Sequence, residues 1–481
     1  MHKKRIVIVG GGTAGTAAAA SARRTDPSTE VIVLEREAVA GAVITQVPDA
    51  LVERRGRAAL RDVDGAGNGL LRAPPARFWE EQGIKLKTGH EVVAIHPERR
   101  EVSVRAPSGA LSAEAYDALV IAAGARPLVP DVPGATLPGV FALRRPTDAV
   151  PLDAHLAELG TRRAVVVGAG IPGMALAEAL QRRGLDVTLV EARQRVLSSF
   201  LPALSARIET AIDEHGGRVL VGQPLERIER RGSALRVTTR GAVVEGDIVV
   251  LTCGALPDIG FARSAIADVG LSGAIRVDEM QHTGVADIYA AGECAETHHS
   301  LLRRSVFQPH PVAAYRQGIV AGANAAGGEK LYRGTVGTRS LRFFDVAIAR
   351  TGLPAEDAQR EGRDVFIATW RRPLEVSVPD VELMVLVVDK PTGVLLGAEM
   401  FGTEAVLLRI DVLAAAIAAR LDLDAVAGLD LALAPPFSQA EDPIRLAAEH
   451  AFEELQHSLR RGEVLETGAR PHRSKSFDAD L

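Results

Sequence analysis

The stretch Arg5-Ile6-Val7-Ile8-Val9-Gly10-Gly11-Gly12-Thr13-Ala14-Gly15 decides the fold of the amino-terminal part of the chain. Its first five residues predict a buried strand, and its glycines at 10, 12 and 15 form a GxGxxG turn. Small residues over 16–22 predict a helix, and a second apolar strand over Glu30–Leu34 ends at Glu35. The glycines let a pyrophosphate approach the start of the helix, and the acid can accept hydrogen bonds from a ribose. This order of elements predicts a dinucleotide-binding fold.

The same pattern returns about 150 residues later. A strand over Arg163–Val167 leads into the turn Gly168-Ala169-Gly170-Ile171-Pro172-Gly173, and a strand over Asp186–Val190 ends at Glu191. We expect a second dinucleotide site here, in which Gly168, Gly170, Gly173 and Glu191 contact the ligand. An acid at this position repels a 2′-phosphate, which favours NAD(H) over NADP(H), although Arg193 and Arg195 lie close by.

Two further apolar segments, 116–127 and 287–295, each end in small residues. The first ends at Ala123-Gly124 and the second at Gly292-Glu293. Small residues at the end of a strand let the backbone approach a flat ligand, so both segments are expected beside a bound cofactor.

Composition limits the class of protein. A chain of 481 residues is expected to form two or three domains. A net charge of −5 gives no reason to expect nucleic acid or an anionic membrane as a partner. We expect no membrane span and no signal peptide. The only two cysteines, Cys253 and Cys294, form no metal-type cluster, so we expect a cytoplasmic protein with neither a disulfide nor a metal site.

The order of these elements resembles the pyridine nucleotide–disulfide oxidoreductase superfamily, and within it the coenzyme A-disulfide reductase and NADH oxidase branch. The carboxyl-terminal third carries the finer match, which lies in the segments 334–338, 344–345, 349–353, 409–413, 434–438 and 442–443. The resemblance implies an α/β fold of two Rossmann-like domains with an α+β dimerisation domain. It places an FAD-binding domain at 1–149 and 276–330, an NAD(P)-binding domain at 150–275, a dimerisation domain at 331–455 and a disordered tail at 456–481.

The resemblance also implies a homodimer with one FAD in each subunit and with NAD(H) as the second cofactor. Glu293 stands where the family usually has Asp, and the helix after Pro311 would direct its positive end at the flavin. The residues expected to contact FAD are Gly10, Gly12, Ala14, Gly15, Glu35, Arg36, Ala123, Gly124, Gly292 and Glu293.

One departure from the family removes its redox cysteine. Pro48 matches the proline of the family's cysteine segment, which places Thr45 at the cysteine position. Threonine forms neither a sulfenate nor a disulfide. Disulfide reduction by the family route, and four-electron reduction of oxygen through a cysteine, are therefore not expected.

Other departures affect the pocket. Leu433 and a residue near Val378 replace family tyrosines. In the second glycine turn Ile171 replaces an aromatic gate and Ala175 replaces a glutamate that places the nicotinamide, while Pro172 removes a backbone donor. These changes leave the use of a nicotinamide open.

Three residues are candidates for the chemistry. Thr45 and Gln46 are expected on the flavin face, with space-filling as the equally plain alternative. His310, just before Pro311, could act as a general acid or base, and the alternative is a loop histidine bonded to backbone. Four other features are interpreted as purely structural: Cys253, Cys294, the pair His298-His299 and the helical stretch Arg445–Arg461. The loop 62–70 is interpreted as a flexible wall or lid of the active site, with a disordered surface loop as the alternative. Pro435 and Phe437 either close the partner's active site across the dimer or pack in the dimer core.

Three functions remain open at this point. In the first, NADH reduces FAD, which passes electrons to a small acceptor or to oxygen. In the second, an organic substrate reduces the flavin directly and little or no NAD(P)H is used. The third is a flavin-binding scaffold without enzymatic activity. The sequence favours the first, because the second glycine turn and its acid are otherwise intact.

Overall fold

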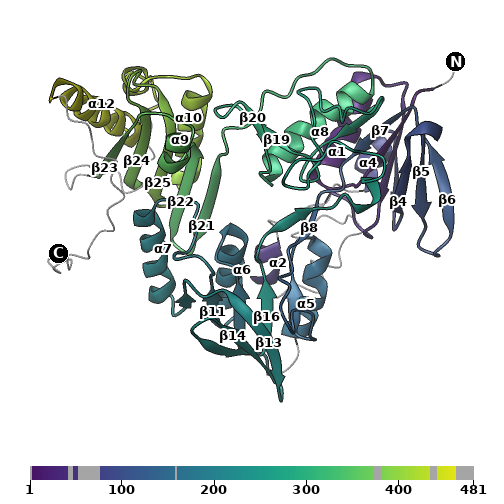
Figure 1. Ribbon diagram of the computed structural model, residues 1–481, viewed down its shortest axis with the longest axis horizontal. Coiled ribbons are helices and arrows are strands. Elements are labelled where there is room, and N and C mark those ends of the chain that lie inside the picture. The colour runs from purple at the N-terminus through teal and green to yellow at the C-terminus, as the bar shows by residue number, and fades with distance from the viewer. Residues whose placement is uncertain are drawn as a thin grey trace.

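Three five-stranded sheets organise the protein, which we describe from a computed structural model. The structure describes residues 3–41, 47–52, 76–157, 160–372, 381–433 and 441–461. Figure 1 shows three lobes, one around each sheet, with the amino-terminal sheet in purple and the carboxyl-terminal sheet in green.

The first sheet is parallel and has the strand order β18-β7-β1-β2-β3. Its strands are β1 (Arg5–Val9), β2 (Glu30–Glu35), β3 (Ile84–Thr88), β7 (Ala118–Ile121) and β18 (Ile288–Ala290). Side chains alternate along β1, so Ile6 and Ile8 pack into one core and Val7 and Val9 into another. A strand buried on both faces reads as one continuous apolar run, which is why this one is visible in the sequence.

Two helices from distant parts of the chain cover one face of this sheet. They are α1 (Thr13–Thr25) and α8 (Pro311–Ala325), which lie side by side in Figure 1. A Cβ at Gly318 or Gly322 of α8 would lie 2.2 or 2.0 Å from a carbonyl oxygen of α1, so glycine is required for this close approach. The other face carries the antiparallel sheet of β4 (Glu91–His96), β5 (Glu101–Arg105) and β6 (Leu111–Ala115).

The second sheet repeats the parallel arrangement, with the order β12-β11-β10-β16-β9. Its strands are β9 (Val140–Ala142), β10 (Arg163–Val167), β11 (Asp186–Val190), β12 (Arg218–Leu220) and β16 (Ile248–Leu251). Helices α5 (Ala149–Leu156), α6 (Ile171–Arg182) and α7 (Pro202–Glu214) and the antiparallel strands β13 (Leu225–Arg231), β14 (Ala234–Thr239) and β15 (Val243–Gly246) complete this lobe. The chain passes between the first and second lobes twice, through the short strands β8 (Ala125–Pro127) and β17 (Ala255–Pro257). These two crossings pair with one another as antiparallel strands.

The third sheet is antiparallel and has the order β21-β22-β25-β24-β23. Its strands are β21 (Arg339–Phe343), β22 (Val346–Gly352), β23 (Val365–Arg371), β24 (Val381–Asp389) and β25 (Leu395–Gly402). Helices α9 (Ala355–Arg360), α10 (Val406–Ala418), α11 (Leu423–Ala427) and α12 (Pro443–Arg461) belong to the same lobe. Shorter elements elsewhere are α2 (Val47–Val52), α4 (Ala76–Glu81), β19 (Thr297–His299), β20 (Arg304–Val306) and the 3₁₀ turns 97–99, 146–148 and 260–262.

The second and third lobes share one hydrophobic core. Phe343 and Phe401 of the third sheet pack in the same cluster as Val166 and Val250 of the second. Val47 and Leu51 of α2 join this cluster, which brings the segment directly after Gln46 against α6. The second lobe is therefore held by packing as well as by its crossings to the first.

The predicted fold class is confirmed: the chain has two Rossmann-like parallel sheets and a carboxyl-terminal α+β domain with an antiparallel sheet. The predicted domain limits stay predictions, and two of them fall inside structural units. Strand β9 hydrogen-bonds to β16, so the second sheet takes up chain before residue 150. Helix α12 continues to Arg461, beyond the expected limit at 455, because its apolar face packs in the core of the third lobe. Among the described residues, no helix is long and apolar enough to cross a membrane.

Candidate functional site: two nucleotide turns and a flavin cavity

The first glycine turn joins β1 to α1 and opens into a cavity of about 480 Å³. Gly10 has a φ of +97°, and a Cβ there would lie 2.4 Å from the carbonyl oxygen of Ala122. A Cβ at Gly15 would lie 1.9 Å from the carbonyl oxygen of Gly10. At Gly12, by contrast, no protein atom lies within 4 Å of a Cβ, so this glycine faces open space. Gly10 and Gly15 therefore shape the turn, and Gly12 leaves room for a ligand.

Glu35 closes the turn from the end of β2. Its carboxylate accepts hydrogen bonds from Gly11 N–H at 2.6 Å and from Glu37 N–H at 2.8 Å. Burial raises the pKa of the Glu35 carboxyl, and these two backbone bonds oppose the rise. Such a held carboxylate at the end of the second strand is positioned to accept hydrogen bonds from a ribose.

The predicted FAD contacts come together in this cavity, with one exception. Gly15 lies behind the turn, while the cavity is lined by Gly10, Gly12, Ala14, Glu35, Arg36, Ala123, Gly124, Gly292 and Glu293. Pro311 and Ala314 of α8 also line it, so the start of α8 points into the cavity. These residues fit FAD. The glycine turn leaves space for the pyrophosphate, Glu35 can accept hydrogen bonds from the ribose, and the amino terminus of α8 would face negative charge on the same elongated ligand. The individual contacts to FAD stay predictions.

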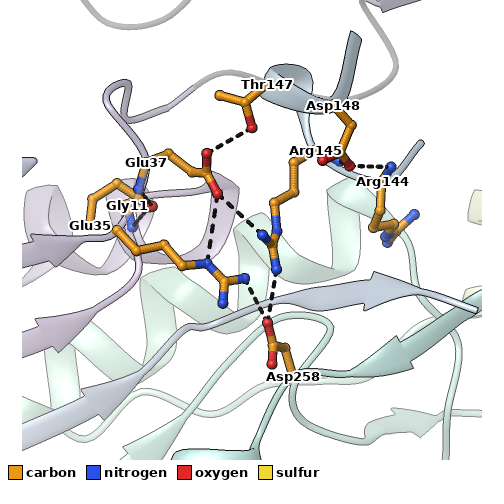
Figure 2. A network of polar contacts seen from close by, with 9 residues as sticks. Gly11, Glu35, Glu37, Arg144, Arg145, Thr147, Asp148 and Asp258 are labelled. Atoms are coloured by element: carbon orange, nitrogen blue, oxygen red, sulfur yellow. Dashed lines mark hydrogen bonds and ion pairs between the residues drawn. The ribbon is translucent and has the colours of Figure 1, made fainter. Parts of the chain in front are cut away.

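A polar network missed from the sequence covers one side of the same cavity (Figure 2). Asp258 accepts hydrogen bonds from Arg36 at 2.6 Å and from Arg145 at 3.1 Å. Glu37 accepts from Thr147 at 2.7 Å and from Arg145 at 3.3 Å. The network thus joins the end of β2 to Asp258, just after β17, and to the segment between β9 and α5 of the second lobe. Each of these four hydrogen bonds joins residues more than 100 positions apart, so no spacing in the sequence signals the network.

Arg144, beside this network, forms an ion pair with Glu293 inside the cavity. Its backbone N–H donates to Asp148 at 2.8 Å, which holds the residue at the start of the second lobe. The cation that faces the Glu293 carboxylate is therefore Arg144, at a position where the family usually has the shorter Asp. Arg144 is therefore a further candidate for contacting the negative charge of a pyrophosphate.

The second glycine turn reproduces the geometry of the first. A Cβ at Gly168 would lie 2.6 Å from the carbonyl oxygen of Thr252, and one at Gly173 would lie 1.9 Å from that of Gly168. Glu191 accepts from Ala169 N–H and from Arg193 N–H, each at 2.8 Å. The backbone atoms that hold Glu35 and those that hold Glu191 correspond one to one. Gly170, like Gly12, has no close neighbour on its Cβ side.

The departures in this turn are accommodated by the structure. Pro172 lies in the first turn of α6, where a backbone N–H has no partner within the helix. Ile171 and Ala175 pack against the core shared with Val47 and Leu51 of α2. The missing donor therefore leaves the helix intact, and the apolar replacements pack against the core.

His310 caps α8. Its Nδ1 accepts from Val312 N–H at 3.3 Å, so the proton of the neutral ring lies on Nε2. Burial, and then the nearby charge of Arg339, lower the pKa of His310 below its usual value. His310 is thus bonded to backbone, as the simpler reading has it, and its catalytic role stays a prediction. The other two candidates, Thr45 and Gln46, lie outside the described residues, as do Val378, Pro435, Phe437 and the loop 62–70.

Neither cysteine faces the flavin cavity. Cys294 is fully buried, and its Sγ lies 3.3 Å from the carbonyl oxygens of Ile121 and Ala291. Cys253 lies two residues after β16 in the second lobe, with its Sγ 3.5 Å from the carbonyl oxygen of Val167. Burial raises the pKa of each thiol to about 11. Both positions agree with packing roles.

Labelling with a disulfide reagent is expected to show that neither thiol reacts in the folded protein. A pKa of about 11 leaves on the order of one thiolate in a thousand at pH 8. We expect the native protein to release less than about a tenth of an equivalent of thionitrobenzoate in minutes, and the denatured protein about two. Because raising the pH increases the thiolate fraction, native labelling should accelerate toward pH 11. Rapid native labelling of one equivalent at pH 8 would contradict this prediction.

Comparisons with known proteins match most of the chain to one protein family. Residues 4–318 match the family model of pyridine nucleotide-disulphide oxidoreductases, and residues 338–442 match the dimerisation domain of that family. The NAD(P)H sulfur oxidoreductase (CoA-dependent) of Pyrococcus furiosus is 35% identical over 383 residues, which cover 79% of this chain and 86% of that protein.

Two solved structures have the same architecture over nearly the whole chain. The NAD-dependent persulfide reductase from A. fulgidus is 29% identical, with a TM-score of 0.87, and the match covers 98% of this chain and 89% of that one. The water-forming NADH oxidase from Lactobacillus brevis, bound to NADH, is 26% identical, with a TM-score of 0.85, and the match covers 95% of this chain and all of that one.

Proposed function

Because the chain belongs to the pyridine nucleotide-disulphide oxidoreductase family, we propose that it transfers a hydride from NADH to bound FAD and then passes two electrons to oxygen or to a small acceptor without a thiol. The comparisons confirm the resemblance predicted from the sequence, including the coenzyme A-disulfide reductase and NADH oxidase branch. The chain is accordingly an FAD-dependent oxidoreductase that uses a pyridine nucleotide. The acceptor and the absence of a thiol relay are the proposed parts.

One observation carries the proposal: both nucleotide turns are intact, while both cysteines face the protein core. Glu35 and Glu191 each accept two backbone hydrogen bonds in the same arrangement, which supports two nucleotide sites in one subunit. The sequence predicts Thr45 at the family's cysteine position. The chain's two cysteines, Cys253 and Cys294, contact backbone carbonyl oxygens elsewhere and do not line the cavity.

The protein's own groups would bind and polarise the cofactors. FAD, when bound, supplies the two-electron acceptor for the hydride. Glu35 would hold its ribose, and Arg144 would face its pyrophosphate. The amino terminus of α8, at Pro311, would stabilise negative charge near the reduced ring. With oxygen as acceptor the balance is NADH + H⁺ + O₂ → NAD⁺ + H₂O₂.

Anaerobic stopped-flow absorbance tests the use of NADH. The purified yellow protein is mixed with NADH, and the flavin band near 450 nm is followed. We expect full bleaching with NADH, and slower bleaching with NADPH because Glu191 opposes a 2′-phosphate. No bleaching with either nucleotide would refute the proposal.

A direct oxidase of a small organic substrate is the second candidate. It is favoured by Ile171 and Ala175 on α6, which stand where the resemblance implies an aromatic gate and a glutamate that places the nicotinamide, and which pack against an apolar core instead. In that case the flavin would remain oxidised with NADH and would bleach with the organic substrate. The stopped-flow experiment separates the two functions.

We also propose a homodimer in the cytoplasm. The dimerisation domain is present, and in the single chain Leu408 of α10 and Leu433 are 76% and 62% exposed. Large apolar side chains at such exposure are typical of a surface that a second subunit covers. Sedimentation of the FAD-loaded protein should give twice the chain mass of 50.8 kDa.

A further inference from the structure

The loop after Glu191 contacts the second glycine turn and the third sheet at the same time. It spans residues 192–201 and begins beside the carboxylate that is expected to hold the ribose of NADH. Leu197 N–H donates to the carbonyl oxygen of Ala169 at 2.9 Å, in the middle of the glycine turn. Any shift of this loop therefore reaches both Glu191 and the turn.

The loop is held in a conformation that it would not favour alone. Leu197 has a φ of +44°, which is costly for a residue with a side chain. Inside the loop, the Arg193 guanidinium donates to Ser198 Oγ at 2.8 Å and the Arg195 guanidinium to the Ser198 carbonyl at 3.2 Å. The surrounding structure must supply the remaining constraint.

Arg350 and Glu399 supply it from the third sheet. They are direct register partners on β22 and β25, so their side chains leave the sheet on one face. Glu399 accepts from Leu201 N–H at 2.8 Å, and Arg350 donates to the carbonyl oxygen of Ser199. The guanidinium of Arg350 lies 5.9 Å from the ring centre of Phe200. Three consecutive loop residues thus each contact this pair.

The contact between this pair and the loop is buried. Glu399 is 3% exposed, Arg350 9% and Phe200 1%, and Phe200 belongs to the core shared by the second and third sheets. Burial is the largest cause of both pKa shifts: it raises the pKa of Glu399 to about 7 and lowers that of Arg350. The charges of Arg350 and Arg195 and the Leu201 N–H face Glu399 and oppose its shift. A hydrophobic pair would avoid this cost, so the polar pair is consistent with a role in fixing one loop position.

We propose that Glu399 and Arg350 are positioning residues for pyridine-nucleotide binding, through which the dimerisation domain sets the loop that follows Glu191. This rests on the proposed use of NADH. Neither residue contacts the nucleotide in this scheme. Glu399 acts on Leu201, Arg350 acts on Ser199, and the loop carries their effect to Glu191 and Ala169.

Calorimetric titration of NAD⁺ into the FAD-loaded, full-length protein tests the proposal. Glu399→Ala is expected to weaken NAD⁺ binding about tenfold, as expected when one buried hydrogen bond is lost. The KM for NADH should rise similarly, while the flavin reduction rate at saturating NADH and the FAD content remain unchanged. Glu399→Gln should bind NAD⁺ nearly as wild type does, because its amide oxygen can accept the Leu201 N–H.

Two more variants complete the design. Arg350→Met removes the second contact and should weaken NAD⁺ binding in the same direction, which keeps the test open if Glu399→Ala folds poorly. Glu453→Ala removes an exposed acid from α12 of the same domain and should bind NAD⁺ as wild type does.

The outcomes separate the two proposals. NAD⁺ affinity within twofold of wild type in both Glu399→Ala and Arg350→Met overturns the positioning role but leaves the proposed function standing. An equal loss in Glu399→Gln and Glu399→Ala overturns the hydrogen-bond argument. A wild-type protein that binds no NAD⁺ overturns both proposals together.

Discussion

Protein carrying Gly12→Val is expected to fold normally but to be colourless after purification. Gly12 has φ −71° and ψ −162°, which valine adopts without strain, and no protein atom lies within 4 Å of its Cβ. The added Cβ therefore meets no packed atom, and the valine side chain is expected to enter the space predicted for the pyrophosphate. We expect FAD affinity to fall at least about a hundredfold, equivalent to roughly 3 kcal/mol. The measurement is the 450 nm absorbance per chain, with circular dichroism to show an intact fold.

Gly170→Val is the matched control for this change. Gly170 lies at the same place in the second turn, with φ −78° and ψ 179° and only Pro172 Cδ near its Cβ, at 3.9 Å. This variant should remain yellow and lose reduction by NADH. If Gly12→Val kept its flavin, or Gly170→Val lost it, the assignment of the two turns would be wrong.

Anaerobic titration is expected to consume one NADH for each FAD. A flavin without a nearby thiol stores two electrons, whereas a flavin with a redox cysteine stores four in the family mechanism. In air, the same protein should form about one H₂O₂ per NADH oxidised, and added catalase should halve the net oxygen uptake. Absorbance at 450 nm and a peroxide assay measure the two ratios.

Counting the thiols after turnover provides the control for this stoichiometry. Denaturation and thiol counting should recover both cysteines unmodified after turnover, since neither reaches the flavin. Consumption of two NADH per FAD, or water as the product with no detectable peroxide, would show that a second redox group takes part.

Much of the fold could be read from local pattern. Arg5–Val9 and Arg163–Val167 are apolar runs buried on both faces of parallel sheets, and each leads directly into a glycine turn. Their helices and acids follow at spacings that the crossover connection requires. The amphipathic stretch of α12 was visible for the same reason, although its end lies beyond the predicted domain limit.

The residues of the candidate site likewise fall into a group that could be predicted from the sequence and a group that could not. The glycines and acids of both turns were predicted because they recur at fixed spacings within one strand–turn–helix–strand unit: Glu35 follows Gly11 by 24 positions, and Glu191 follows Ala169 by 22. Arg144, Arg145 and Asp258 were missed because their partners lie on other elements of the chain. A single arginine or aspartate carries no signal of its own until a sheet crossing places it at the cavity.

By itself the sequence determined the two dinucleotide units and the family, whereas the placement of Thr45 at the family's cysteine position stays a prediction. These follow from short-range chemistry: which backbone angles glycine permits, which atoms an acid can accept from, and which side chains can carry electrons. Only the tertiary structure decided what surrounds those units. The pairing of Arg350 and Glu399 with residues 199–201, and the network around Asp258, depend on packing between sheets distant in sequence. Such contacts are set by how the folded layers meet, which no local pattern records.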